Sequence, residues 1–560
     1  MANNKIKFIL EEYEDKFEFK NDKSKLNLRF NRIAFIFFTF FSIFLIYSIH
    51  LLHLGSRKSS IDINKTNTSS KIHRSDIIDR NGNFIAKTVG SIDIGINPPE
   101  VIDKKKLLIN LKYIFPNKDY KAIKAKLKNN KFFWFEKKIS EENYEKLMML
   151  GDKSLKPEQK LTRVYPQKNL FSHVIGQIDD DNNGISGLEK TLDKELKNNK
   201  EAIKLTLDKE IQFLVREELL KFNDIFNTIG SAAILMNVNN GEIISIISLP
   251  DFDLNKRLNI TDVNYINRAT KGVYELGSVF KTFTLAAALN ENIISPKTEF
   301  KNLKKNIKCG KNTISEYDDK IPSNLTAEQI LIRSGNIGSI RIGQAVGLEK
   351  FKKFIFDMGL TSPIKFDIEE VGVPVPFNWG KCKLATVSYG HGITTTILQL
   401  AKAYSIVANG GYEIKPSLIK KDKYLKNNRI LNEKVSKEIV RILRKIVTQK
   451  EGTASLANVN GYEVAGKTGT AQKSVEGGYS KKKINTFASI FPASNPKYSL
   501  VVMLDEPKTN SEYIYNYRDG SGIKYKGTPF NTAGWTTVEV TGKIIEKIGP
   551  ILATKYNEIK

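Results

Sequence analysis

The chain has 560 residues, several times the usual domain length of roughly 100–200, so a single small module is excluded and two to four folded units are expected. Lys and Arg total 88 against 61 Asp and Glu, a net charge of +27, while 41% hydrophobic residues supply a sizeable core and exclude a disordered chain. The lysines are spread along the chain without a nucleic-acid motif, which favours a compositional bias over a nucleic-acid partner.

An uncharged apolar segment covers residues 33–54 (IAFIFFTFFSIFLIYSIHLLHL). As a helix of 22 residues it would be roughly 33 Å long, enough to span the core of a bilayer. The basic residues that precede it are Lys20, Lys23, Lys25, Arg29 and Arg32, whereas only Arg57 and Lys58 follow closely. The positive-inside rule therefore predicts a cytoplasmic tail at 1–32 and an exported remainder. A cleaved signal peptide is less favoured, because the apolar run exceeds a signal h-region and ends without a clear cleavage site.

The next two segments are predicted to be a linker and a module without catalytic residues. Residues 55–70 are polar and aperiodic, which is typical of a linker. From 71 to 204 the signals are mixed: a turn at Asp79–Gly82, an extended stretch at Arg163–Pro166, and a helix start at Gly187–Lys190. We find no catalytic constellation there and predict a spacer or docking module, a pedestal.

Residues 205–560 show sharper patterns, which predict one α+β domain. A helix is expected over Leu207–Phe222, and Asn239-Asn240-Gly241 between two apolar runs predicts a β-hairpin. Further helices are predicted at Val279–Leu289, after the capping box Thr326–Gln329, from Glu349 to Gly359, and at Glu433–Gln449. Later strands are predicted at Tyr462–Ala465, Thr486–Phe491 and Leu500–Leu504, before a final helix. We expect an antiparallel sheet that pairs early and late segments and is flanked by helices.

The two cysteines, Cys309 and Cys382, lack the spacing of a zinc or redox motif and are too few for a disulfide framework. The sequence leaves open whether they form one bridge or none. No metal and no cofactor are expected.

The first motif with chemical potential is Ser278-Val279-Phe280-Lys281. Ser-x-x-Lys also occurs at Ser417–Lys420 and Ser480–Lys483, but only Ser278 follows a glycine and precedes an apolar helical run. Residues three apart at a helix start share a face, so the Lys281 ammonium could reach the Ser278 hydroxyl. The lysine could accept the serine proton only if burial and nearby cations lower its pKa from about 10.4 towards neutrality.

The second motif is Ser334-Gly335-Asn336, which lies between two predicted helices. We expect both polar side chains on the same side of a short extended link. There the Ser334 hydroxyl could relay a proton and the Asn336 amide could bind a peptide bond.

The third motif is Lys467-Thr468-Gly469-Thr470, at the end of a predicted strand. A cation and two hydroxyls are suited to a substrate carboxylate, and Gly469 would allow close approach of the backbone. The backbone N–H groups of Ser278 and Thr470 could together bind a developing oxyanion if the strand edge lies beside the nucleophile.

Ser-x-x-Lys, Ser-x-Asn and Lys-Thr-Gly, in this order, resemble the motif set of class A β-lactamases and penicillin-binding proteins. With the apolar anchor and the module at 71–204, the chain resembles a class B penicillin-binding protein, and within that family the septal transpeptidases of cell division. The further segments that carry the resemblance are Arg74–Gly82, Gly187–Glu189, Asn267–Ala269, Tyr274–Glu275, Ser388–Gly392, Gln399–Ala401 and Glu451–Ala454.

The resemblance implies roles for the motif residues. Ser278 would attack the D-Ala-D-Ala carbonyl of a peptidoglycan stem peptide, Lys281 would be the general base, and Ser334 would pass a proton to the leaving amine. Asn336 would hold the substrate backbone, and the Lys467, Thr468 and Thr470 side chains would hold its terminal carboxylate. An amine from a second stem peptide would then resolve the acyl-enzyme into a cross-link, and β-lactams would acylate the same serine.

The resemblance also implies a location, partners and alternatives. We expect a single-pass protein of the bacterial inner membrane, with a periplasmic catalytic domain at 205–560. A membrane glycosyltransferase and other division proteins are implied as partners, because residues 71–204 show no acidic catalytic pair for polymerisation. The alternatives are an elongation-type transpeptidase and a non-catalytic penicillin-binding scaffold or sensor; the intact Ser278–Lys281 pair disfavours the scaffold, and the anchor disfavours a hydrolytic β-lactamase.

Overall fold

The computed structural model describes residues 32–56, 73–257, 261–310, 312–380, 382–424, 428–475 and 478–555, which fall into two units divided after Ser70. The first unit contributes helix α2 (Arg32–Ser56), which confirms the helix predicted over 33–54. Among the helices that the structure describes, it alone is long and apolar enough to cross a membrane. The predicted tail at 1–32 and linker at 55–70 fall almost entirely outside the described residues.

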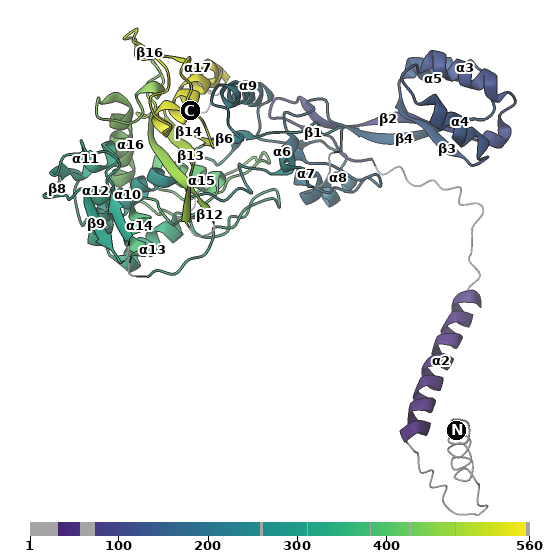
Figure 1. The fold of residues 1–560 in the computed structure, drawn as a ribbon, viewed down its shortest axis with the longest axis horizontal. Coiled ribbons are helices and arrows are strands. Elements are labelled where there is room, and N and C mark those ends of the chain that lie inside the picture. Colours follow the sequence, from purple (N-terminus) through teal and green to yellow (C-terminus); the bar gives the residue numbers. More distant parts are fainter. Residues whose placement is uncertain are drawn as a thin grey trace, which may run out of the picture. The chain divides into compact units, whose positions relative to one another are not determined.

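The second unit begins with a sheet whose strand order is β3-β2-β1-β5, with β4 also paired to β2 (Figure 1). Its strands are β1 (Ile77–Ile78), β2 (Phe84–Ile96), β3 (Phe133–Ile139), β4 (Leu155–Val164) and β5 (Ile203–Lys204). The short helices of this region are η2 (Pro98–Glu100), α3 (Lys104–Ile114), α4 (Tyr120–Lys128), α5 (Glu141–Met148), α6 (Ser172–Ile175), α7 (Gly187–Thr191) and α8 (Asp193–Asn198). The predicted turn at Asp79–Gly82 and helix start at Gly187 are both present.

A five-stranded, fully antiparallel sheet forms the centre of the following domain, in the order β12-β13-β14-β6-β7. Its strands are β6 (Gly230–Asn237), β7 (Ile243–Leu249), β12 (Ala465–Val475), β13 (Gly478–Phe491) and β14 (Tyr498–Asp505). Gly241, with φ +77°, closes the predicted hairpin between β6 and β7. Leu235 of β6 lies opposite Leu500 of β14, so the sheet joins early and late segments and the predicted α+β fold is confirmed.

Helices cover both faces of this sheet, as the complete burial of β7 and β14 requires. Helices α9 (Lys209–Ile225) and α17 (Thr537–Lys555) contact each other and the sheet, and α15 (Ile397–Ala408) and α16 (Glu433–Thr448) form a second such pair. The remaining helices are η3 (Val263–Tyr265), η4 (Gly277–Phe280), α10 (Lys281–Asn290), α11 (Ala327–Ile332), α12 (Asn336–Val346), α13 (Leu348–Asp357), α14 (Lys383–Ser388), η5 (Ser455–Ala457) and η6 (Ala533–Trp535). Three short two-stranded pairs complete the domain: β8 (Glu299–Phe300) with β11 (Leu325–Thr326), β9 (Asn306–Cys309) with β10 (Asn312–Ser315), and β15 (Ile514–Asn516) with β16 (Lys524–Lys526). In Figure 1, α10–α14 and β8–β9 gather in one lobe beside the sheet.

The strand predicted at Tyr462–Ala465 is wrong. Gly461 and Glu463 have φ values of +85° and +45°, which no regular strand accommodates, so residues 461–464 form a turn. Strand β12 begins only at Ala465 and continues through the third motif to Val475. The motif therefore lies within an inner stretch of strand, paired to β13, and not at a strand end.

One hydrophobic core runs from the base of the pedestal into the sheet domain. Ile77, Leu188 and Leu205 belong to the same buried cluster as Leu235 and Leu500. The same hydrophobic core therefore continues across the boundary predicted between residues 204 and 205. The division into 71–204 and 205–560 stays a prediction.

A buried ionic cluster fixes the pedestal base. The Glu189 carboxylate, fully buried, is bonded by Arg74 Nε at 2.5 Å and by Arg163 Nε at 2.7 Å. Arg74 Nη1 also reaches Asp193 at 2.7 Å. Because all three of the Arg74, Glu189 and Arg163 side chains are out of contact with water, their charges depend on one another.

We predict that Glu189→Gln lowers the stability of the folded chain by about 3–5 kcal/mol, because it leaves the buried Arg163 guanidinium without its anion and Arg74 with Asp193 alone. Thermal unfolding of the purified protein, followed by circular dichroism, measures the effect. The matched control is Glu142→Gln, which breaks only the exposed pair with Lys146 and should leave the melting temperature nearly unchanged. Equal melting temperatures for both variants would contradict the structural role of the cluster.

Candidate active site

The first motif lies in a tight turn at the start of a buried helix. Ser278 belongs to the 3₁₀ turn η4, and the α-helix α10 begins at Lys281. The helix predicted from Val279 is thus preceded by a 3₁₀ turn that carries the serine. Ser278 is partly exposed and lines a cavity of about 570 Å³, while the Lys281 side chain is buried behind it.

Three glycines let backbone pack directly on backbone around this turn. A Cβ on Gly277, whose φ is +63°, would lie 2.8 Å from the Thr470 carbonyl oxygen. A Cβ on Gly390 would lie 2.0 Å from the Gly277 carbonyl oxygen, and one on Gly469 only 2.1 Å from that of Leu276. Gly469, predicted to bind substrate, is absent from the cavity lining and instead faces the nucleophile turn, so it allows close approach of the chain to itself.

The second motif differs from its prediction in backbone shape. Ser334 has φ +58°, Gly335 is the N-cap of α12, and Asn336 is the first residue of that helix, so the expected extended link is wrong. The reason is that Ser334 ends the turn after α11 in the left-handed conformation, a strained state for serine that surrounding packing must hold. Both side chains nevertheless reach the same group: Lys281 Nζ donates to Ser334 Oγ at 3.3 Å and to Asn336 Oδ1 at 2.7 Å.

Lys281 also donates to the Ser334 carbonyl oxygen. Ser278 Oγ is not among the described hydrogen-bond acceptors of Lys281. The catalytic hydrogen bonds of free enzymes are often long and tighten only when substrate binds.

The third motif places its lysine beside the second. Lys467 Nζ donates to Ser334 Oγ at 2.8 Å and to the Thr468 carbonyl oxygen at 3.0 Å. The Ser334 hydroxyl therefore lies between two amines, those of Lys281 and Lys467. Thr468 and Thr470 both line the cavity, so the two hydroxyl groups are within reach of a bound molecule.

Burial controls the charge of both lysines. Desolvation lowers the pKa of Lys281 to about 7, and the carboxylate of Glu316 opposes that shift. Desolvation, with the nearby charge of Lys281 as a second cause, lowers the pKa of Lys467 well below its usual value. At neutral pH Lys281 is thus partly unprotonated and able to accept a proton. Its pKa is lowered towards neutrality, as the sequence analysis required of a lysine that acts as a base.

Taken together, residues far apart in the chain meet at one wall of the cavity. The wall presents the hydroxyl groups of Ser278 and Ser334, and the Ser334 hydroxyl links two buried amines, those of Lys281 and Lys467. This set matches acyl transfer through a covalent serine intermediate, in which a base activates the serine and preorganised donors stabilise an oxyanion.

Other residues of the site were missed in the sequence. Thr453 Oγ1 lies 2.7 Å from Thr468 Oγ1, and Tyr389, His391 and Trp535 line the cavity. Thr453, Tyr389 and His391 lie in segments that carried the resemblance, but nothing in those segments gave them a chemical role. Trp535 lay in no motif, because only the fold brings the segment before α17 beside β12.

Comparisons with known proteins identify similar chains. The family model for the penicillin binding protein transpeptidase domain matches residues 231–521, and that for the penicillin-binding protein dimerisation domain matches residues 69–219. The probable peptidoglycan D,D-transpeptidase FtsI of Caulobacter vibrioides is 30% identical over 500 residues, which cover 86% of this chain and 82% of that protein. The probable peptidoglycan D,D-transpeptidase PenA of Neisseria meningitidis is 30% identical over 70% of this chain and 72% of its own. The crystal structure of penicillin binding protein 3 from Mycobacterium tuberculosis, complexed with aztreonam, shares the fold, with a TM-score of 0.65, 22% identity and coverage of 86% of this chain and 97% of that one.

We predict that Lys281→Met removes a pH dependence of stability. In the parent, the pKa of Lys281 is about 7 when folded and near 10.5 when unfolded. The unfolded state therefore binds more protons between these values, and the stability of the parent rises with pH across that window. The variant lacks this rise, so its stability relative to the parent should be greatest near pH 7.5 and smaller at pH 9.5.

Urea unfolding of both proteins at the two pH values measures this difference. Exposed Lys297→Met is the control and should follow the parent. A gap between Lys281→Met and parent that stays constant with pH would contradict the depressed pKa.

Proposed function

Since the chain belongs to the penicillin-binding protein transpeptidase family, we propose that the cavity at Ser278 is the active site of a peptidoglycan D,D-transpeptidase and the target of β-lactams. The observation that carries the proposal is that Ser278 and Ser334 line one cavity while the buried amines of Lys281 and Lys467 both bond to Ser334. The reaction would transfer the acyl group of a D-Ala-D-Ala stem peptide first to the serine and then to an amine of a second stem.

The acylation step assigns a role to each group on the wall. Lys281, partly unprotonated at neutral pH, takes the proton of the Ser278 hydroxyl as Ser278 Oγ bonds to the penultimate D-alanine carbonyl carbon. The C–N bond to the terminal D-alanine then breaks, and its nitrogen receives a proton through the Ser334 hydroxyl, which Lys281 and Lys467 both contact. Deacylation reverses these proton movements, with the acceptor amine in place of D-alanine.

The remaining motif residues hold the substrate. Thr468 and Thr470 line the cavity and are the proposed ligands of the terminal carboxylate, with the amine of Lys467 nearby. Asn336 is the proposed partner of the substrate backbone. The backbone N–H groups of Ser278 and Thr470 are the proposed oxyanion donors, which the glycine contacts bring close together.

The location follows from the first unit. We propose that α2 is a single-pass anchor in the inner membrane, with residues 1–32 in the cytoplasm and the catalytic domain in the periplasm. Residues 71–204 would act as a pedestal and 205–560 as the transpeptidase domain, in keeping with the two matched family models. A membrane glycosyltransferase would supply the glycan strands. That enzyme and other division proteins would be partners of this chain.

We propose a septal role in cell division in preference to an elongation role. The support is the similarity to FtsI proteins of Caulobacter vibrioides and Buchnera aphidicola. A transpeptidase of side-wall elongation would share the architecture and the reaction, so the location of synthesis distinguishes the two roles.

We predict that a fluorescent penicillin labels the purified chain covalently and that Ser278→Ala abolishes the label. The label should persist, because a transpeptidase deacylates slowly where a β-lactamase turns the drug over. The matched control is Ser480→Ala, which alters another Ser-x-x-Lys sequence and should label like the parent. Rapid loss of the label would indicate a β-lactamase, and a parent that takes no label would indicate a non-catalytic scaffold.

We further predict that a fluorescently tagged copy of the full chain concentrates at the division site of dividing cells. Time-lapse microscopy measures its position against the septum. A signal spread along the side wall throughout the cell cycle would refute the septal role and leave the transpeptidase activity unaffected.

A further inference from the structure

A hairpin outside the three motifs contacts the second motif. It consists of β9 and β10, and Glu316 follows its last strand. The Glu316 carboxylate accepts the backbone N–H of Asn336 at 2.7 Å and that of Ile337 at 2.8 Å. Helix α12 has no side-chain cap at its own N-cap residue, Gly335, so Glu316 supplies the cap from a distant part of the chain.

The hairpin also fixes the Asn336 side chain. Asn336 Nδ2 donates to the Ser315 carbonyl oxygen at 2.8 Å, which turns Oδ1 towards Lys281 Nζ, 2.7 Å away. Two consecutive hairpin residues therefore hold both the backbone and the amide of Asn336. The neighbouring Ser334 has its strained conformation between this start of α12 and the end of α11, where its backbone N–H donates to the Leu331 carbonyl oxygen.

Glu316 has an electrostatic effect on the site as well. Its negative charge favours the protonated form of Lys281, and the charge of Lys281 in turn disfavours the charged form of Lys467, from β12. Replacement of the Glu316 carboxylate by an uncharged group should therefore lower the pKa of Lys281.

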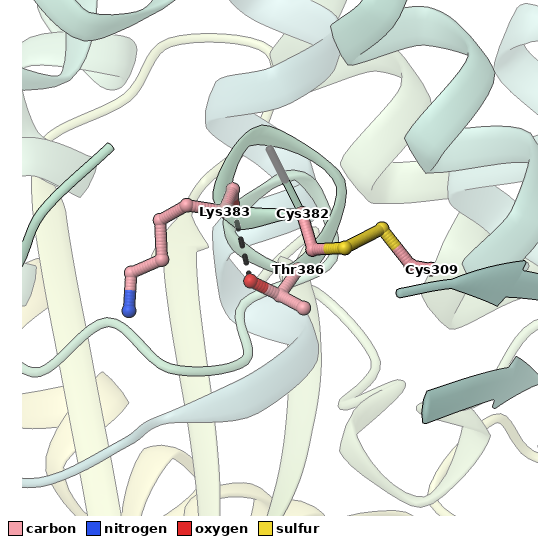
Figure 2. Close-up of a disulfide and its surroundings, with 4 residues drawn as sticks. All are labelled: Cys309, Cys382, Lys383 and Thr386. Carbon is pink, nitrogen blue, oxygen red and sulfur yellow. Dashed lines mark hydrogen bonds between the residues drawn. A yellow bond between two sulfur atoms is a disulfide. The ribbon is translucent and has the colours of Figure 1, made fainter. Parts of the chain in front are cut away.

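A disulfide between Cys309 and Cys382 ties the hairpin to α14, which answers the question that the sequence left open (Figure 2). Cys309 ends β9, and Cys382 is the N-cap residue of α14. The other end of α14 packs closely on α12, where a Cβ on Gly343 would lie 2.0 Å from Ser388 Oγ. The hairpin, α12 and α14 are thus joined in a ring by the disulfide, by the hydrogen bonds of the Glu316 carboxylate to the start of α12, and by the packing of α14 on α12.

From this ring we propose that Glu316 is a positioning residue for the transpeptidase reaction, which holds Ser334 and Asn336 against Lys281, and that the Cys309–Cys382 disulfide holds Glu316 in place. The proposal rests on the proposed function. It adds a residue that is itself absent from the cavity lining and acts through Asn336, which lines the cavity.

The test measures second-order rate constants for acylation of the full chain in detergent by a fluorescent penicillin, from pH 5.5 to 9. Glu316→Gln should lose on the order of 10-fold to 100-fold in rate, because one charge-assisted acceptor is lost. The midpoint of its pH profile should also move to lower pH, since the unprotonated lysine is the active form. Glu316→Asp keeps the charge, so its midpoint should stay near that of the parent even if its rate falls. The control Asp319→Asn removes an exposed charge three residues along and should change neither quantity.

The role of the disulfide is tested by a double-mutant cycle. The pair Cys309→Ser with Cys382→Ser should slow acylation in the parent but cause little further loss in the Glu316→Gln background, because both changes act through one contact. Fully additive losses would overturn the disulfide's role. A Glu316→Gln variant with the parent's rate and midpoint would overturn the positioning role alone, whereas a parent that is not acylated at Ser278 would overturn the proposed function and the positioning role with it.

Discussion

The structure of the site depends on one unusual constraint, the burial of two amines around a single hydroxyl. Lys281 and Lys467 both donate to Ser334 Oγ, at 3.3 and 2.8 Å, and both are out of contact with water. A buried amine is tolerated only if it loses its charge or finds acceptors, and here desolvation lowers both pKa values. The same arrangement that makes the pair costly to bury makes one amine a base at neutral pH.

The fold brings these two amines together from distant parts of the chain. Lys467 lies on β12 at the edge of a sheet whose other edge, β7, is formed far earlier in the chain, and Lys281 begins a helix in the lobe beside that sheet. Antiparallel pairing between early and late strands therefore sets the distance between the motifs. The Glu189 cluster fixes the pedestal base, whose core is continuous with that of the catalytic domain. Stability and catalysis thus rest on separate buried ionic groups within one compact unit.

Local patterns were enough to predict α9, α10, α11, α13, α16 and α17, the first hairpin, most strands of the sheet and the order of the motifs, because hydrophobic period and turn residues act over short distances. The sequence failed where the backbone is set by distant contacts. Ser334 and Glu463 both have positive φ, which nothing in their neighbours required, and the predicted extended link and strand were wrong there. Glu316 was missed for the same reason, since its partners lie twenty residues away. The pairing of the cysteines, 73 residues apart, likewise needed the fold.

The glycine contacts at the nucleophile turn have a consequence for how the target could change under drug pressure. Around Gly277, Gly390 and Gly469 the chain meets itself through main-chain atoms, and any added side chain would clash. A point mutation replaces a side chain and leaves the peptide backbone chemically the same. Single substitutions therefore cannot reshape the surface at these glycines without a clash. The side chains of Tyr389 and Trp535 also line the cavity, and a point mutation there would change the surface that an inhibitor meets.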